Sequence, residues 1–136
     1  MKTTTIDKHY DERGFFYEVW RGNPPMDIKQ VNISFSKRGV IRGIHFEPWN
    51  KYIHVVSGSV LCCIVDKNGN TEFHQLTGNE AIFVPKGYGN SFQALEDTYY
   101  LYIVDGLWKP GKKYKSLPAT SIDWPIKDWI VSAKDA

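Results

Sequence analysis

The amino-acid sequence predicts an all-β fold, a single antiparallel jelly-roll barrel spanning residues 1–136. Short runs rich in β-branched and aromatic residues are separated by Gly, Asn, Asp and Pro, which is typical of sheets built from short strands. The length suits one domain, and five Trp, eight Tyr and seven Phe are enough to fill a barrel core and to line a binding site. No internal repeat or linker divides the chain.

The expected strands are separated by recognisable turn signals. The first strand, 14–20, ends at the turn Gly22-Asn-Pro-Pro25, and Lys67-Asn-Gly-Asn70 is a strong hairpin signal between two later strands. The tail, 121–136, is expected to form a short helix or an extended arm. The other strands are expected at 27–35, 40–46, 51–56, 60–66, 71–76, 80–84, 90–95 and 98–104.

The strand at 27–35 has one polar face. Gln30, Asn32 and Ser34 alternate with apolar residues, so their side chains share one side of the strand. Such a face lies either in solvent or inside a polar-lined barrel. Uncharged amides and a hydroxyl suit hydrogen bonds to a polyol, which supports the alternative that this face lines the barrel interior.

Composition and charge argue against several classes of partner. Seventeen basic and fifteen acidic residues give a net charge of +2, which suggests neither a nucleic acid nor a membrane surface as partner. No apolar run approaches the roughly 18 residues of a membrane span, and no signal peptide follows Met1. Cys62 and Cys63 are adjacent, so on a strand they point to opposite faces and do not pair. We therefore expect a reducing, cytoplasmic location.

Residues 39–58 have the spacing of a metal-cupin motif but lack most of its metal ligands. Of the three histidines and one glutamate in the metal form, only His45 remains; the other positions hold Glu47, Lys51 and, in a downstream block, Asn90. One imidazole beside a lysine cation does not hold a divalent ion, which needs about three convergent ligands. We expect no metal or other cofactor. A histidine base and a lysine cation instead suit proton transfer.

Several sequence blocks, in order along nearly the whole chain, resemble the dTDP-4-dehydrorhamnose 3,5-epimerase family of cupins. Each block alone is a weak signal, but together and in this order they are specific. The blocks are Asp11-Glu-Arg13-Gly-Phe-Phe-Tyr-Glu18, Gln30-Val-Asn32-Ile-Ser34, Arg42-Gly-Ile-His45-Phe46, Val84-Pro85-Lys-Gly87, Ile122-Asp-Trp124-Pro125 and Ser132-Ala-Lys134-Asp135.

The resemblance implies a cupin barrel that epimerises a nucleotide-diphosphate 4-keto-6-deoxyhexose in deoxysugar and polysaccharide biosynthesis. By this resemblance His45 removes a proton alpha to the C4 ketone, and Asp135 is its dyad partner. Lys51 would stabilise the enolate oxygen, and Tyr102 would be the acid on the opposite ring face. The sugar would be linked to dTDP, CDP or GDP, and the protein would be a homodimer with shared sites.

The resemblance also implies substrate-binding residues. Arg13 and Glu18 are similar to residues that reach the nucleotide, often across a dimer interface. Other residues match positions near the sugar and the diphosphate, two of them with a side chain unusual for the family. These residues are Gln30, Asn32, Ser34, Arg42, Asn90 and Trp108.

Three departures from the family pattern bear on the reaction. Cys62 replaces an aspartate, Asn90 a histidine and Trp108 a tyrosine, which favours inversion at C3 alone over inversion at C3 and C5. The same departures leave open a catalytically idle nucleotide-sugar-binding cupin. A 3,4-ketoisomerase of a similar sugar ranks lower, because Glu47 interrupts the His-x-His pair usual in that group. A metal oxygenase is the weakest alternative for want of ligands.

Overall fold

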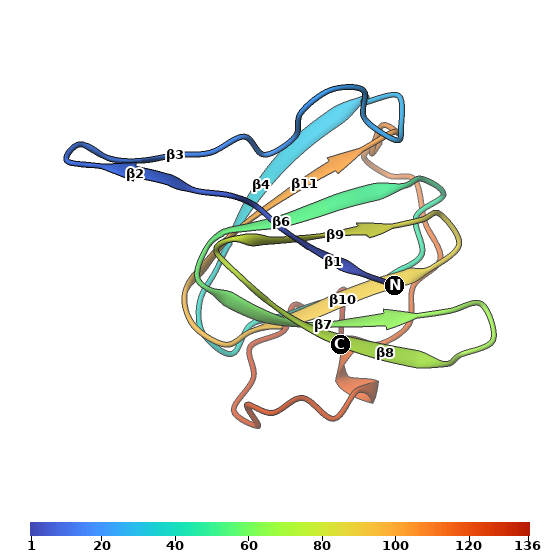
Figure 1. The fold of residues 1–136 in the computed structure, drawn as a ribbon. Helices are drawn as coiled ribbons and strands as arrows, with labels where there is room; N and C mark the ends of the chain where they lie inside the picture. The colour runs from blue at the N-terminus through green and yellow to red at the C-terminus, as the bar shows by residue number, and fades with distance from the viewer.

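The structure, a computed structural model, covers all 136 residues, and its regular secondary structure is β-strand apart from one 3-10 turn (Figure 1). A five-stranded sheet has the order β1-β9-β6-β11-β4, and a four-stranded sheet has the order β5-β10-β7-β8. Every strand pair is antiparallel. The strands are β1 (Thr3–Thr5), β2 (His9–Asp11), β3 (Gly14–Phe16), β4 (Gln30–Ser36), β5 (Ile41–His45), β6 (Lys51–Ser57), β7 (Ser59–Val65), β8 (Thr71–Thr77), β9 (Glu80–Val84), β10 (Gly89–Ala94) and β11 (Thr98–Val104).

The main core lies between the two sheets. Ile53 and Val55 of the five-stranded sheet pack in one buried cluster with Cys62 and Phe92 of the four-stranded sheet. Successive side chains of a strand point to opposite faces, so each sheet contributes alternate residues to this cluster. The fold is the predicted antiparallel jelly roll, and β4 to β11 correspond to the eight strands expected from 27–35 onward.

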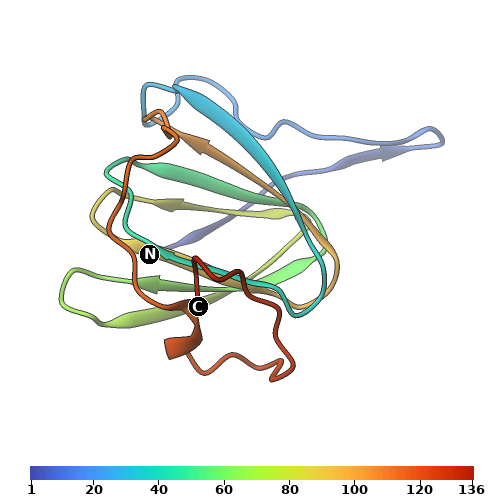
Figure 2. The same cartoon turned by 180° about the vertical axis from the view of Figure 1, so that it is seen from behind.

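A second core lies on the outer face of the four-stranded sheet, where the segment after β11 crosses it (Figure 2). Trp124 is fully buried there against Ile44 and Cys63, and its indole N–H donates to the carbonyl of Ala119 at 2.9 Å. The tail is thus an irregular arm with one 3-10 turn, Ala119–Ser121, because its apolar residues are fixed by the sheet. This packing returns Asp135 to the edge of the barrel.

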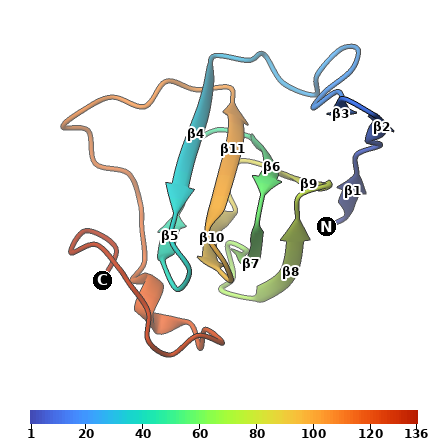
Figure 3. The same ribbon diagram turned by 90° about the vertical axis from the view of Figure 1, so that its left-hand side faces the viewer.

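The N-terminal residues form a hairpin of β2 and β3 that extends from the barrel, opposite the C-terminal segment (Figure 3). The prediction of one strand at 14–20 was wrong in extent, and β1 and β2 were not predicted. All three strands consist of exposed residues, so they lack the alternation that burial of one face imposes.

Both cysteines are free and buried, Cys62 in the inner core and Cys63 in the outer one, as strand alternation predicted. The predicted hairpin after β7 is present, and Asp66 stabilises it by accepting hydrogen bonds from the backbone N–H groups of Asn68 and Asn70. No helix in the structure has the length and apolar character required to cross a bilayer.

Candidate active site

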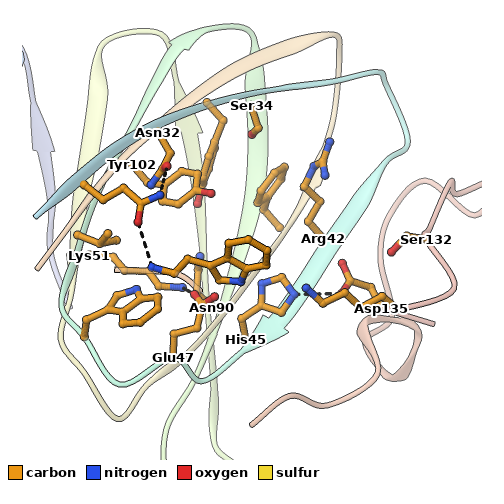
Figure 4. Close-up of a pocket in the computed structure, with 17 residues that line it drawn as sticks. Asn32, Ser34, Arg42, His45, Glu47, Lys51, Asn90, Tyr102, Ser132 and Asp135 are labelled. Atoms are coloured by element: carbon orange, nitrogen blue, oxygen red, sulfur yellow. Dashed lines mark hydrogen bonds and ion pairs between the residues drawn. The ribbon is translucent and has the colours of Figure 1, made fainter. Parts of the chain in front are cut away.

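A cavity of about 370 Å³ lies inside the barrel, and ten of the twelve predicted site residues line it. Gln30, Asn32 and Ser34 of β4 form part of its wall, while the apolar residues between them are exposed on the outside. The polar face of this strand therefore lies in the barrel interior. Figure 4 shows Asn32, Lys51 and Tyr102 on one side of the cavity and Arg42, His45 and Asp135 on the other.

His45, the last residue of β5, is paired with Asp135. Its Nε2 lies 3.0 Å from Oδ1 of Asp135, and the other carboxylate oxygen accepts the backbone N–H of Gly43 at 3.2 Å. An ionised carboxylate only accepts hydrogen bonds, so in neutral His45 Nε2 carries the hydrogen and Nδ1 keeps its lone pair. This is an oriented imidazole of the kind that serves as a general base.

Gly43 allows β5 to approach β10 at this point. Its φ is +121°, and a Cβ atom would lie 2.6 Å from the carbonyl oxygen of Asn90. Any other residue would be strained in conformation and would push the two strands apart. The glycine of the Arg-Gly-x-His block thereby positions both the His45 ring and the backbone N–H that binds Asp135.

Lys51 begins β6 with its ammonium group in the cavity wall. Its Nζ donates to Oε1 of Glu47 at 2.5 Å, and the two side chains are only 6% and 16% exposed. Glu47 was not among the predicted site residues, although the cupin spacing had placed it at a ligand position two residues after His45. The cavity therefore contains a buried ion pair next to the base.

Two tyrosines of β11 also line the cavity. Burial raises the pKa of Tyr102, the charge of Glu47 raises it further, and Arg42 partly opposes the rise, so this phenol is protonated at neutral pH. Tyr100, two residues earlier on the same face, was not predicted. Burial raises the pKa of Tyr100 well above the ordinary value, and the nearby Asn90 amide lowers it in part. The Tyr100 hydroxyl is buried, and no group forms a hydrogen bond of ordinary geometry with it.

Asn90 and Cys62 occupy two of the three positions where the sequence departs from the family pattern. Asn90 pairs in register with His45 across β5 and β10, and its Oδ1 is buried without a partner. Cys62 is fully buried beneath the cavity, where burial raises the pKa of its thiol to about 12. Cys62 is thus an unreactive, small apolar side chain.

Arg42 and Trp108 complete the predicted set around the cavity. The Arg42 guanidinium donates to the hydroxyl of Ser36 at 2.9 Å and to the carbonyl of Phe35 at 3.1 Å. The backbone N–H of Trp108 donates to Oε1 of Gln30 at 3.1 Å, and its indole is about half exposed. The remaining lining residues, none of them predicted, are Trp49, Phe92, Val104, Ser132 and Lys134.

Arg13 and Glu18 do not reach the cavity of their own chain. Arg13 lies in the turn between β2 and β3 and pairs with Asp11 at 2.6 Å. Glu18 pairs with Arg21 beside a second, more open hollow. The structure therefore does not bring these two predicted residues together with the other ten.

The donor set of the cavity does not suit a metal ion. No group of three or more His, Cys, Asp or Glu side chains converges in the structure. Three of the four cupin ligand positions hold His45, Glu47 and Lys51. His45 contacts Asp135, and Glu47 contacts the Lys51 ammonium, which is itself a cation and cannot bind a metal ion. What the residues present can do is move a proton and stabilise a negative oxygen.

A family model described as dTDP-4-dehydrorhamnose 3,5-epimerase matches residues 1–136. The chain is 31% identical to the dTDP-4-dehydrorhamnose 3,5-epimerase of Mycobacterium tuberculosis over 93% of this chain and 73% of that protein. It is 29% identical to the dTDP-4-dehydrorhamnose 3-epimerase of Streptomyces niveus over 96% and 74% of the two chains. The solved structure of RmlC from Streptococcus suis in complex with dTDP-D-xylose has a TM-score of 0.86 at 34% identity, covering 98% of this chain and 81% of that one. Since the family model covers the whole chain, the chain belongs to the dTDP-4-dehydrorhamnose 3,5-epimerase family.

Proposed function

We propose that this protein inverts C3 of a dTDP-linked 4-keto-6-deoxyhexose through an enolate intermediate. The observation that carries the proposal is the His45–Asp135 pair at 3.0 Å, facing Lys51 and Tyr102 in one cavity. A proton beside a ketone is weakly acidic, and a positioned base accelerates its removal about 10²- to 10⁴-fold. An acid on the far side is also needed, because return of the proton from the same side restores the substrate.

The proposed reaction has two proton transfers. His45 takes the proton from C3, the C–H electron pair moves into a C3–C4 double bond, and the C4 oxygen becomes negative beside Lys51. Asp135 stabilises the resulting imidazolium. Tyr102 then donates its phenolic proton to the opposite face of C3, and the C4 ketone re-forms. One positioned donor to a developing oxyanion contributes about 3–4 kcal/mol in hydrolytic enzymes, which sets the scale for the role of Lys51.

The choice of C3 and of dTDP has separate support. Asn90, Cys62 and Trp108 replace three polar or phenolic groups of the family pattern, which leaves fewer acids and bases for a second inversion at C5. The relative from Streptomyces niveus is named as a 3-epimerase. The Streptococcus suis structure contains a dTDP-sugar, which favours dTDP over CDP or GDP.

We also propose a homodimer that shares its sites. Val31, Ile33 and Phe35 are 58%, 63% and 41% exposed on the outer face of β4, which is an edge strand of its sheet. An apolar edge of this kind is a ready surface for a second copy. The hairpin carrying Arg13 extends from the barrel, where it can reach another copy. Ile33→Asp should give monomers in analytical ultracentrifugation; a parent protein that is itself monomeric would contradict the proposal.

Solvent deuterium exchange tests the reaction. The protein is incubated in D₂O with dTDP-4-keto-6-deoxyglucose, and the C3 and C5 protons and the ring configuration are followed by NMR. Exchange with inversion at C3 alone supports the proposal, and inversion at both carbons would replace it with the double reaction. A 3-keto product would identify a 3,4-ketoisomerase, and binding without exchange would identify an idle sugar-binding cupin.

We propose the cytoplasm as the location, in line with two free cysteines.

A further inference from the structure

Glu47 places a carboxylate against Lys51, in the same cavity as Tyr102. One of its oxygens binds Nζ of Lys51 at 2.5 Å, and its charge acts on the phenol of Tyr102. Glu47 lies in the segment between β5 and β6, and its side chain is 84% shielded inside the same cavity as His45. A carboxylate at this depth is costly unless it has a defined partner.

The contact with Glu47 restricts the position of Lys51. A lysine ammonium is a point charge on a flexible four-carbon stem, so it has no fixed direction of its own. Here one N–H bond is held by Glu47, and the other two remain available to a substrate oxygen in the cavity. An anchored ammonium loses less conformational freedom when it binds the developing enolate.

The charge of Glu47 matters for Tyr102 as well. Among the charges around this phenol, Arg42 lowers its pKa and Glu47 raises it. β4 presents only uncharged side chains to it, Gln30, Asn32 and Ser34. The titratable and charged groups that line the cavity from the other elements are Arg42, His45, Glu47, Lys51, Tyr100, Lys134 and Asp135.

We propose that Glu47 is a positioning residue that anchors the Lys51 ammonium beside the substrate oxygen and places a negative charge in the cavity that Tyr102 also lines. The inference rests on the proposed function. It assigns the unpredicted carboxylate of this chain a role in both halves of the reaction: the enolate is stabilised by Lys51, and the far face receives its proton from Tyr102.

Glu47→Gln tests the charge while keeping the size of the side chain and a hydrogen-bond acceptor for Lys51. The rates of exchange and inversion are measured against pH. In Glu47→Gln the alkaline decline of inversion should move to lower pH by about 1 unit, because the phenol loses its negative neighbour and keeps the positive charge of Arg42. Exchange, which depends on His45, should keep its parent pH profile. Glu47→Asp should restore the parent profile of inversion.

Glu96→Gln is the matched control, since Glu96 is exposed in the turn between β10 and β11. It should leave both profiles unchanged. A profile of inversion that is the same in Glu47→Gln as in the parent, or one that Glu96→Gln moves equally, would overturn the proposal.

A second measurement does not depend on turnover. The protein is labelled with ¹³C at the tyrosine ring carbon bearing the hydroxyl, Tyr102→Phe identifies the signal, and the ionisation midpoint of Tyr102 is followed by NMR. The midpoint should fall in Glu47→Gln. If Glu47→Gln does not fold, comparison of Lys51→Met with Lys51→Met/Glu47→Gln isolates the same charge, and an unchanged midpoint would overturn the proposal. Absence of exchange in the parent would refute the proposed function, whereas an unchanged midpoint would refute the role of Glu47.

Discussion

Replacing Tyr102 with Phe should separate two events that occur together in the parent, deuterium exchange and inversion. His45 would still remove and return protons on one face of the sugar, so deuterium would enter the substrate with its configuration retained. Inversion requires delivery from the other face, and it should fall by at least about 10²-fold, the usual cost of losing a positioned acid.

The structure indicates a small effect of this change on stability. Burial and neighbouring charges set the pKa of Tyr102, with no hydrogen bond among the causes, and the side chain faces the cavity. Phe fits the same space, so the free energy of unfolding should change by less than about 1 kcal/mol. Because its pKa is raised above the ordinary value near 10, Tyr102 keeps its proton until the pH exceeds that value. Inversion by the parent should therefore decline only in that alkaline range.

The assay follows the isotope content at C3 and the ring configuration in the same NMR sample. Tyr99→Phe is the control, because Tyr99 lies on the outer face of the same strand, half exposed and stacked on Phe35. It should leave both rates unchanged. If exchange and inversion decline together in Tyr102→Phe, or neither declines, Tyr102 is not the acid.

Three other perturbations have defined outcomes. His45→Asn should abolish deuterium exchange at every carbon while nucleotide binding persists. Adding Asp135→Asn should lower the activity little further, since the two residues act as one unit. Near-parent turnover by His45→Asn would show that His45 is not the base. Tyr100→Phe should raise the free energy of unfolding by about 1 kcal/mol in urea denaturation by removing a buried hydroxyl without a partner; a loss of stability would show that the hydroxyl is bonded. Burial raises the pKa of the Cys62 thiol to about 12, so as the pH rises the unfolded chain loses this proton before the folded chain does. The contribution of Cys62 to the free energy of unfolding is therefore complete below about pH 8.5 and declines by about 1.4 kcal/mol per pH unit toward pH 12. Cys62→Ala should show a shallower alkaline decline, and equal slopes would contradict that account.

The sequence predicted strands best where burial imposes a pattern. Gln30, Asn32 and Ser34 are spaced two apart because β4 has one face toward the cavity and one toward the outside. The alternation could not decide which face lay inside, since the outer face is the apolar one and exposed. In β1 and β2 neither face is buried, so no pattern marks them and only the pairing with β9 or β3 defines them.

The site was predictable to the extent that local spacing determined it. His45 and Lys51 follow from the cupin motif, but the contact of His45 with Asp135 spans 90 positions and depends on the tail being fixed by Trp124 on the outer core. The residues around His45 in the sequence do not indicate that the tail returns to this point. Glu47 was interpreted only as a lost metal ligand, because the motif gives its position but not its partner.

The ion pair between Glu47 and Lys51 suggests how a metal-cupin framework can serve enolate chemistry. A divalent ion in such a barrel would supply positive charge to a ketone oxygen; in this chain a lysine stands where the motif has a metal-binding glutamate, so the charge comes from the chain itself. A bare ammonium in the cavity would be costly to bury and would also draw the nearby phenol toward its ionised form. The carboxylate two residues after the base addresses both effects, at the cost of a weaker field at the enolate oxygen. The position of Glu47 in the sequence thus links the base, the cation and the acid: it lies two residues after His45, binds Lys51 directly and acts on Tyr102 through its charge.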